Sequence, residues 1–148
     1  MFEISVEETF AAAHQLREYK GKCENLHGHN YRVRISVAAG ELDRTGLVVD
    51  FVELKRQMRA IIERLDHTFL NQTPPFDVLN PSAENLAKHF YDEMSPALKT
   101  GRARISAVKI WETDTSTATY RPSAARPAPP RGHPAPGRGS EAVTEPRA

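Results

Sequence analysis

The spacing of apolar residues changes along the chain, first following the two-residue repeat of strands. Residues 2–7 alternate apolar and polar side chains, which predicts a half-buried strand that ends at His14. In residues 27–37 the odd-numbered positions share one face of a second strand. Residues 43–46 are typical of a turn, and residues 47–49 predict a third strand returning from it.

From residue 54 onward the apolar spacing becomes helical. The first predicted helix has an apolar face formed by Leu54, Met58, Ile61, Ile62 and Leu65. A loop containing Pro74, Pro75 and Pro81 follows, and Ser82 is a suitable N-cap for a second helix. Residues 105–112 and 117–120 predict a closing pair of strands. This order predicts an α+β domain in which two helices cover one face of an antiparallel sheet.

The composition changes sharply near Arg121. Residues 122–148 are rich in Pro, Gly, Ala and Arg, and Val143 is their only bulky apolar residue. Such a segment buries too little surface to offset the entropy of ordering it. The sequence therefore predicts one folded domain, residues 1–121, followed by a disordered tail, residues 122–148.

Charge and hydropathy exclude several classes of protein. The formal net charge is +1, so no overall field attracts nucleic acid or membrane, and no apolar run approaches the roughly 20 residues of a bilayer span. The N-terminal residues lack the basic and apolar regions of a signal peptide. We therefore expect a cytoplasmic protein. The single cysteine, Cys23, excludes an internal disulfide and a zinc site made of several thiolates.

The most informative motif is His27-Gly28-His29. Two residues apart on a strand, both imidazoles project from one face, about 6.6 Å apart along the backbone. His14 ends the preceding strand, which would lie beside this one in an antiparallel pair. Three histidines with an open fourth position are typical of catalytic zinc. The alternative is that each histidine is simply a packed or surface residue.

Three further residue types carry candidate chemistry. Cys23 could be a buried core residue, a fourth metal ligand or a base. Its polar, charged neighbours argue against the core, and a base is favoured over a ligand because a cysteine ligand would close the site. Asp66 orients His67 for proton transfer, or else His67 only complements a helix C-terminus. Glu112 shares a strand face with apolar residues, so its carboxylate requires a partner such as the N–H groups of a ligand.

Taken together, these motifs resemble the 6-pyruvoyltetrahydropterin synthase family, in order from about residue 2 to 121. The matching blocks are Phe10-x-x-x-His14, Cys23-x-x-x-His27-Gly28-His29-Asn30-Tyr31, Gly46-x-Val48-x-Asp50-Phe51, Leu65-Asp66-His67-x-x-Leu70-Asn71, Pro81-Ser82-x-Glu84-Asn85 and Trp111-Glu112-Thr113. The short gap between Cys23 and His27 is similar to that of the bacterial 6-carboxy-5,6,7,8-tetrahydropterin synthase branch. Ser82 stands where the family usually has threonine.

The resemblance implies an architecture and an assembly. The fold is expected to be the tunnelling fold, a four-stranded antiparallel sheet with two helices on one face, in the order ββααββ. Three subunits close a barrel, and two trimers stack as a homohexamer. The active sites lie between subunits, where Asp66 and His67 are supplied by a neighbouring copy.

The resemblance also implies a reaction and roles. Zinc held by His14, His27 and His29 would act on 7,8-dihydroneopterin triphosphate, with Cys23 and His67 moving protons. Glu112, with Thr113, would hold the pterin ring. The product would be 6-carboxy-5,6,7,8-tetrahydropterin, a precursor in queuosine and 7-deazapurine biosynthesis.

The sequence is also compatible with other functions. Within the family, the alternative is a pyruvoyl-forming enzyme that only eliminates triphosphate. Outside it stand a non-catalytic pterin- or zinc-binding protein and the dihydroneopterin epimerase and aldolase group of the same fold.

Overall fold

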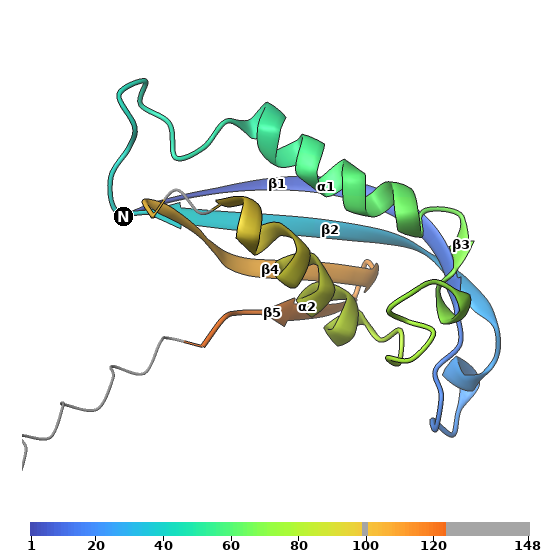
Figure 1. The fold of residues 1–148 in the computed structure, drawn as a ribbon. Helices are drawn as coiled ribbons and strands as arrows, with labels where there is room; N and C mark the ends of the chain where they lie inside the picture. Colours follow the sequence, from blue (N-terminus) through green and yellow to red (C-terminus); the bar gives the residue numbers. More distant parts are fainter. Residues whose placement is uncertain (99–100, 124–148) are drawn as a thin grey trace, which may run out of the picture.

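A five-stranded sheet crossed on one face by two helices makes up the protein (Figure 1). The computed structural model describes residues 1–98 and 101–123, except for the side chain of Cys23. The spatial order of the strands is β3-β1-β2-β4-β5. Their bounds are Phe2–His14 for β1, His27–Ala39 for β2, Thr68–Phe69 for β3, Ala103–Thr113 for β4 and Ser116–Tyr120 for β5.

The prediction of a four-stranded, purely antiparallel sheet is wrong in one respect. The four long strands are antiparallel neighbours, but the two-residue β3 adds a parallel edge beside Ala12 and Ala13 of β1. It follows directly from His67, whose φ of 56° turns the chain after the first helix. A strand of two residues is too short to show an alternation of apolar and polar positions, so the sequence pattern does not reveal β3.

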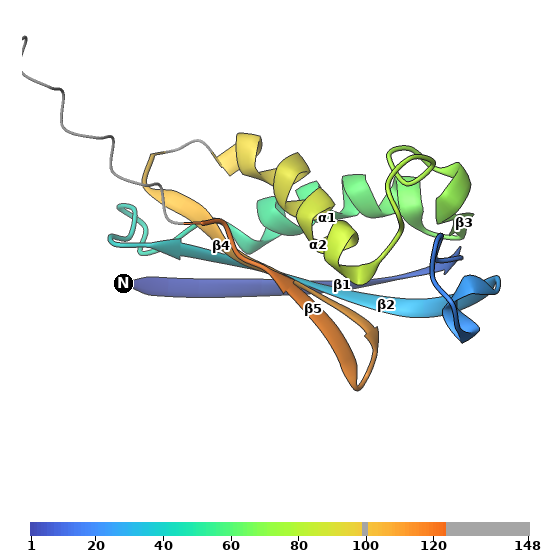
Figure 2. The same ribbon diagram turned by 90° about the horizontal axis from the view of Figure 1, so that it is seen from below.

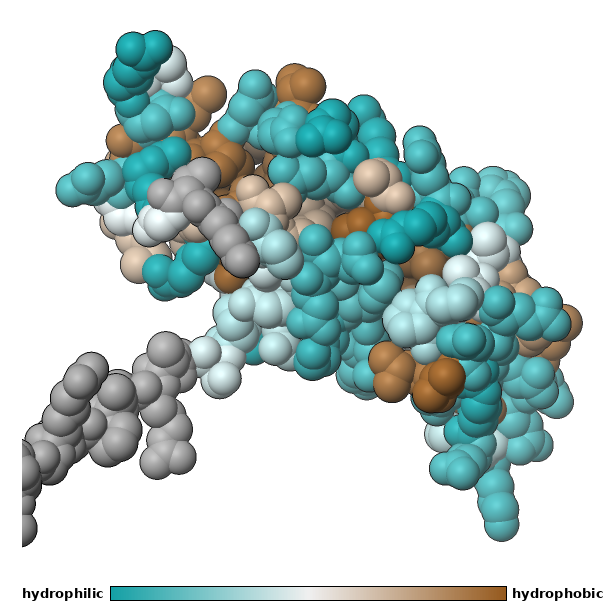
Figure 3. All heavy atoms as spheres, in the orientation of Figure 1, coloured by the Kyte–Doolittle hydropathy of each residue, from teal (hydrophilic) through white to brown (hydrophobic). Residues whose placement is uncertain are grey.

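Both helices begin where a side chain caps them. Helix α1 spans Phe51–Leu65, and Asp50 accepts the N–H of Val52 at 2.8 Å. Helix α2 spans Ala83–Met94, and Ser82 accepts the N–H of Asn85 at 3.2 Å, which confirms the predicted N-cap. The helices lie side by side on one face of the sheet (Figure 2), and the surface they present outward is mostly hydrophilic (Figure 3). Their apolar faces close the core against the sheet.

The predicted third strand at residues 47–49 is also wrong. The turn before it forms, with Gly46 at φ 83° and its N–H bonded to the carbonyl of Asp43. The following carbonyls, however, do not join a strand, and Leu47 O accepts the N–H of Asp43 at 2.9 Å within the turn. Arg102 donates to Leu47 O at 3.3 Å and to Val48 O at 2.9 Å. The guanidinium thereby replaces the ladder that a third strand would need.

An irregularity in β4 decides which of its residues face the helices. The register with β2 shifts between Ser36, opposite Ala107, and Val37, opposite Ile105, so Ser106 is an extra residue. Before it the odd positions face the core, and after it the even ones do, Val108 and Ile110 being fully buried. Glu112, the next even position, therefore points to the helix side of the sheet.

Short 3-10 helices complete the described chain: η1 at Lys22–Glu24, η2 at Leu70–Gln72 and η3 at Ser95–Leu98. The tail predicted for 122–148 falls, from residue 124 onward, outside the described residues. Within the part that is described, no helix combines the length and the apolar character needed to cross a bilayer.

Candidate metal centre

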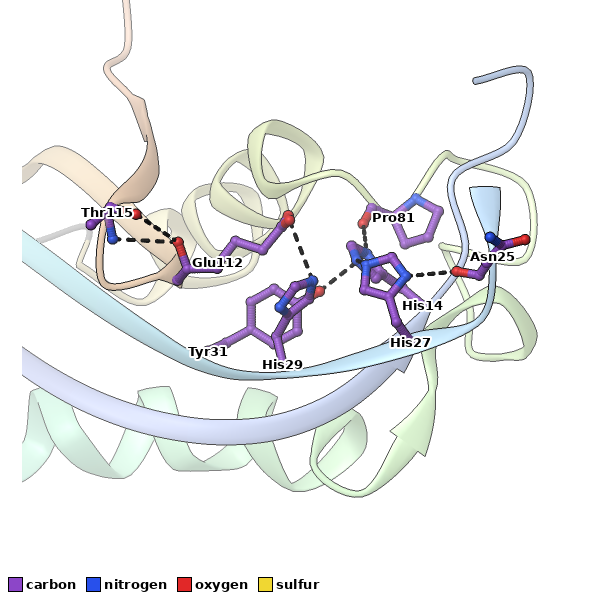
Figure 4. Close-up of polar contacts among 9 residues, drawn as sticks. His14, Asn25, His27, His29, Tyr31, Pro81, Glu112 and Thr115 are labelled. Atoms are coloured by element: carbon purple, nitrogen blue, oxygen red, sulfur yellow. Dashed lines mark hydrogen bonds and ion pairs between the residues drawn. The ribbon is translucent and has the colours of Figure 1, made fainter. Parts of the chain in front are cut away.

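Three imidazoles converge at one end of the helix-covered face of the sheet (Figure 4). Antiparallel pairing sets His14, the last residue of β1, opposite His27, the first residue of β2. His29 follows on the same face of β2. The ring centroid of His14 lies 4.5 Å from that of His27 and 5.0 Å from that of His29. The structure thus brings together the three histidines proposed as ligands.

Hydrogen bonds to backbone carbonyls fix two of the tautomers. His14 Nδ1 lies 2.8 Å from Pro81 O, and His27 Nδ1 lies 2.6 Å from Asn25 O. A carbonyl only accepts, so each Nδ1 carries the hydrogen, and in a neutral imidazole each Nε2 keeps its lone pair. Those two Nε2 atoms face one another at 2.9 Å. Two converging lone pairs repel unless a cation lies between them, which is the arrangement of metal-binding histidines.

Burial favours the neutral, metal-binding form of the rings. His14 is fully buried. Desolvation lowers the pKa of His14 and of His29 below the ordinary 6.5, and it outweighs the opposing influence of Glu112. Both rings therefore present unprotonated nitrogens at neutral pH.

A carboxylate joins the cluster from β4. Glu112 Oε1 lies 3.3 Å from His29 Nε2, which has no hydrogen-bond partner among the described residues. One atom from each of His14, His27, His29 and Glu112 lies within 4.8 Å of the other three. Tetrahedral zinc with bonds of about 2.0–2.1 Å separates its ligand atoms by about 3.3 Å. The cluster therefore fits a metal ion after small side-chain movements.

Asp66 and His67 form a second pair outside this cluster. The Asp66 carboxylate accepts the N–H of Ala11 at 2.8 Å and contacts His67 Nδ1 at 2.9 Å. The bond from Ala11 first, and the bond from His67 second, lower the pKa of Asp66, so it stays ionised. The His67 side chain is nonetheless 82% exposed. An oriented imidazole thus projects from the sheet edge into solvent.

A cavity of about 480 Å³ adjoins both His67 and His29 of the cluster. Its lining includes Ala11 and Ala13 of β1 and Gly28 and Asn30 of β2. These positions alternate with those of the three histidines, so their side chains point to the opposite face. The cavity beside the oriented imidazole is therefore lined partly from the face opposite the cluster, and His29 is the cluster member that also borders it.

The remaining predicted residues lie at the margins of the site. Cys23 belongs to η1, four residues before His27, and its side chain lies outside the described part of the structure. Thr113 ends β4, where its hydroxyl accepts the N–H of Thr115 at 3.3 Å in the turn to β5. Neither role proposed for them is tested by these contacts.

Sequence reasoning missed the groups that hold the histidines. His14 Nδ1–H is shared between Pro81 O and the hydroxyl oxygen of Tyr31, which is fully buried 3.1 Å away. Arg17 in turn secures the loop that leads to Pro81. Its guanidinium donates to the carbonyls of Leu79, Asn71, Phe76 and Asp77. The position of Tyr31 two residues beyond His29 was a usable signal; nothing in the sequence pointed to Arg17 or to a carbonyl.

Comparison with known proteins places this arrangement in a family. The family model described as 6-pyruvoyl tetrahydropterin synthase matches residues 3–123. The chain belongs to the 6-pyruvoyl tetrahydropterin synthase family. All four members of the cluster fall inside the matched region, as do Asp66 and His67.

Relatives in this family carry two different names. The 6-carboxy-5,6,7,8-tetrahydropterin synthase of Bacillus subtilis is 37% identical over 82% of this chain and 86% of its own. That of Synechocystis sp. is 36% identical over 81% and 93%. The 6-pyruvoyl tetrahydrobiopterin synthase of Drosophila melanogaster is 39% identical over 77% and 76%. Overall identity thus separates the family from other proteins but does not separate the two activities.

Solved structures support the same fold. The 6-pyruvoyl tetrahydropterin synthase of Caenorhabditis elegans superposes with a TM-score of 0.74, at 28% identity over 82% of this chain and 96% of its own. The α+β architecture with two helices on one sheet face is therefore that of known 6-pyruvoyl tetrahydropterin synthase structures.

Proposed function

We propose that this protein converts 7,8-dihydroneopterin triphosphate to 6-carboxy-5,6,7,8-tetrahydropterin, with release of acetaldehyde and triphosphate, in queuosine and 7-deazapurine biosynthesis. The observation that carries the proposal is the convergence of His14, His27 and His29, with the Nδ1 atoms of His14 and His27 hydrogen-bonded to backbone carbonyls. Membership in the family supports a pterin substrate. The carboxy-forming outcome rests on the three-residue gap between Cys23 and His27.

The donor set fits zinc better than magnesium or calcium. Three imidazole nitrogens are borderline-soft ligands, whereas the two hard cations take oxygen ligands almost alone. When bound, zinc supplies a Lewis acid that acidifies the hydroxyls and the adjacent C–H bond of the substrate side chain. His14, His27 and His29 are its protein ligands in this proposal.

The protons are moved by side chains beside that centre. Cys23, as thiolate, accepts the proton from the substrate carbon. His67 donates and accepts protons at Nε2, because Asp66 holds its Nδ1 at 2.9 Å. Glu112, with Thr113, accepts the N–H groups of the pterin ring, a paired charge-assisted contact.

The exposed position of His67 supports an assembled enzyme. A proton donor that is held by Asp66 yet 82% exposed is placed to act on a substrate bound by a second copy. We therefore propose a homo-oligomer, a dimer of trimers, in which His14, His27 and His29 of one copy meet Asp66 and His67 of another.

The deciding experiment is product analysis. The purified protein is incubated with zinc and dihydroneopterin triphosphate, acetaldehyde is trapped, and the mass of the pterin product is measured. Acetaldehyde in equal amount to the pterin acid supports the proposal. Triphosphate release with retention of the carbon side chain would instead identify the pyruvoyl-forming activity. Stoichiometric zinc with no turnover would identify a binding protein.

A further inference from the structure

Glu112 lies between His29 and a cavity in the described structure. On one side is His29, whose Nε2 lies 3.3 Å from Glu112 Oε1. On the other is a cavity of about 220 Å³ between the start of α2 and the β4–β5 hairpin, lined by Glu112 together with Ser82, Glu84 and Thr117. The Glu112 side chain is 22% exposed, so it is neither buried in the core nor fully surrounded by solvent.

The backbone at Glu112 explains how the side chain reaches both. Trp111 pairs with Thr117 and Thr113 with Ser116, so two steps along β4 match one step along β5. Glu112 is the inserted residue of this bulge. Alternation along β4 already points Glu112 to the helix side of the sheet, where the histidines lie, and a bulge bends the strand at that residue.

The contacts of Glu112 assign it to the histidine cluster. No lysine or arginine forms an ion pair with Glu112 among the described residues, and His29 is the partner that approaches it. With a divalent cation on the three imidazoles, the carboxylate is the nearest anion. A fourth protein ligand would close the coordination sphere, as in structural zinc sites.

The proposed pterin contact uses the same two oxygens. A guanidine-like edge takes a carboxylate through two parallel N–H···O bonds, which occupy both oxygens in one plane. The carboxylate must then face the cavity and leave the cluster. One carboxylate cannot hold the metal and the ring at once.

We propose that Glu112 is an exchanging ligand: it binds the metal in the free protein and transfers to the N–H edge of the ring when pterin enters the cavity. The inference rests on the proposed function. Ring binding then opens a coordination position just as the substrate side chain arrives. The same exchange keeps the metal closed to water and other ligands while the site is empty.

Exchange makes metal and ring compete for Glu112, and such coupling is reciprocal. We therefore expect the metal-free protein to bind unsubstituted pterin, which has no side chain for the metal, about tenfold more tightly than the metal-loaded protein does. Pterin should weaken metal binding by the same factor. Fluorescence titration of pterin, with and without Zn²⁺, measures the first quantity.

Cobalt reports the coordination directly. In the Co²⁺-loaded protein, Glu112→Gln should shift the visible absorption spectrum and weaken Co²⁺ binding by about tenfold or more. Adding unsubstituted pterin to the wild-type protein should shift the spectrum in the same way. The matched control is Glu84→Gln, which alters another carboxylate of the same cavity that has no contact with the histidines, and its spectrum should stay as in the wild type.

Two results would overturn the inference in different ways. If Co²⁺ binds and the protein turns over, but Glu112→Gln and pterin both leave the spectrum and the Co²⁺ affinity unchanged, Glu112 is not a ligand and only the exchange fails. If the wild-type chain binds neither Co²⁺ nor Zn²⁺, the exchange fails together with the proposed function.

Discussion

The histidine cluster and the Asp66–His67 pair differ in how far a single chain buries and surrounds them. The cluster is built from residues of β1 and β2 that pair in the sheet, with a buried ring and acceptors fixed by the backbone. The Asp66–His67 pair is also oriented, but its imidazole is 82% exposed at the edge strand. One region is organised within the fold of a single chain, whereas the other leaves its imidazole in solvent, where the proposed oligomer would place a second copy.

The difference separates metal binding from turnover. Metal affinity should depend on residues that one chain holds together, and catalysis should depend in addition on residues brought by another. Variants in the two regions should therefore fail in different ways.

The largest effect is expected for His27→Ala. Removing one of three imidazole ligands, and with it the Nδ1 bond to Asn25 O, should lower bound metal from stoichiometric to near zero and abolish turnover. Metal analysis after dialysis and the acetaldehyde assay measure both losses. Full activity in this variant would end the metal hypothesis for this region.

His67→Ala should abolish turnover and keep the metal. Its ring contacts no member of the cluster within the described structure, so metal content should equal that of the wild type. Dialysis and metal analysis provide the check. Loss of metal in this variant would show that the two regions are not separate.

Mixing the two inactive variants sharpens the comparison. If each site takes its metal half from one copy and His67 from another, refolding an equal mixture should restore about a quarter of wild-type activity, since half the copies carry each intact half. The control is the same mixture without refolding or exchange of subunits. No recovery after confirmed exchange would assign both halves to one chain.

A smaller effect is expected for Tyr31→Phe. The hydroxyl shares the Nδ1–H of His14 with Pro81 O, and loss of such an outer partner typically weakens metal binding about 10–100-fold. Competition with a chelator measures the affinity. Tyr91→Phe is the matched control, because Tyr91 packs against Tyr120 and not against the histidines. Equal affinities for the two variants would remove Tyr31 from the site.

The smallest effect is a pH dependence of the metal-free protein. Burial lowers the pKa of His14 and His29 below 6.5, so the unfolded chain takes up protons that the folded chain does not as the pH falls through 6.5. The free energy of unfolding should be level above that pH and decrease below it. Urea unfolding between pH 5.5 and 7.5 measures the slope, which His29→Gln should reduce. An unchanged slope would show that His29 is not desolvated.

Much of the fold followed from the order of polar and apolar residues. The alternation in β1 and β2 predicted both strands, and the spacing of Leu54 to Leu65 predicted α1, because burial of one face imposes a period on the sequence. The same reasoning predicted a strand wrongly at residues 47–49. Val48 is buried as a strand residue would be, but Arg102 satisfies the carbonyl there, and periodicity cannot tell the two apart.

The sequence by itself determined which residues have metal-binding chemistry and which face of β2 they share, since strand geometry converts the spacing of His27 and His29 into proximity. Only the tertiary structure decided what holds and surrounds them. The carbonyl of Pro81 sets the tautomer of His14, and the pairing of β4 with β2 brings the Glu112 carboxylate to His29. These features depend on backbone atoms, which every residue carries alike, and on the pairing of strands that are far apart in the sequence. Local sequence therefore identifies the candidate ligands, and the fold sets their protonation and their neighbours.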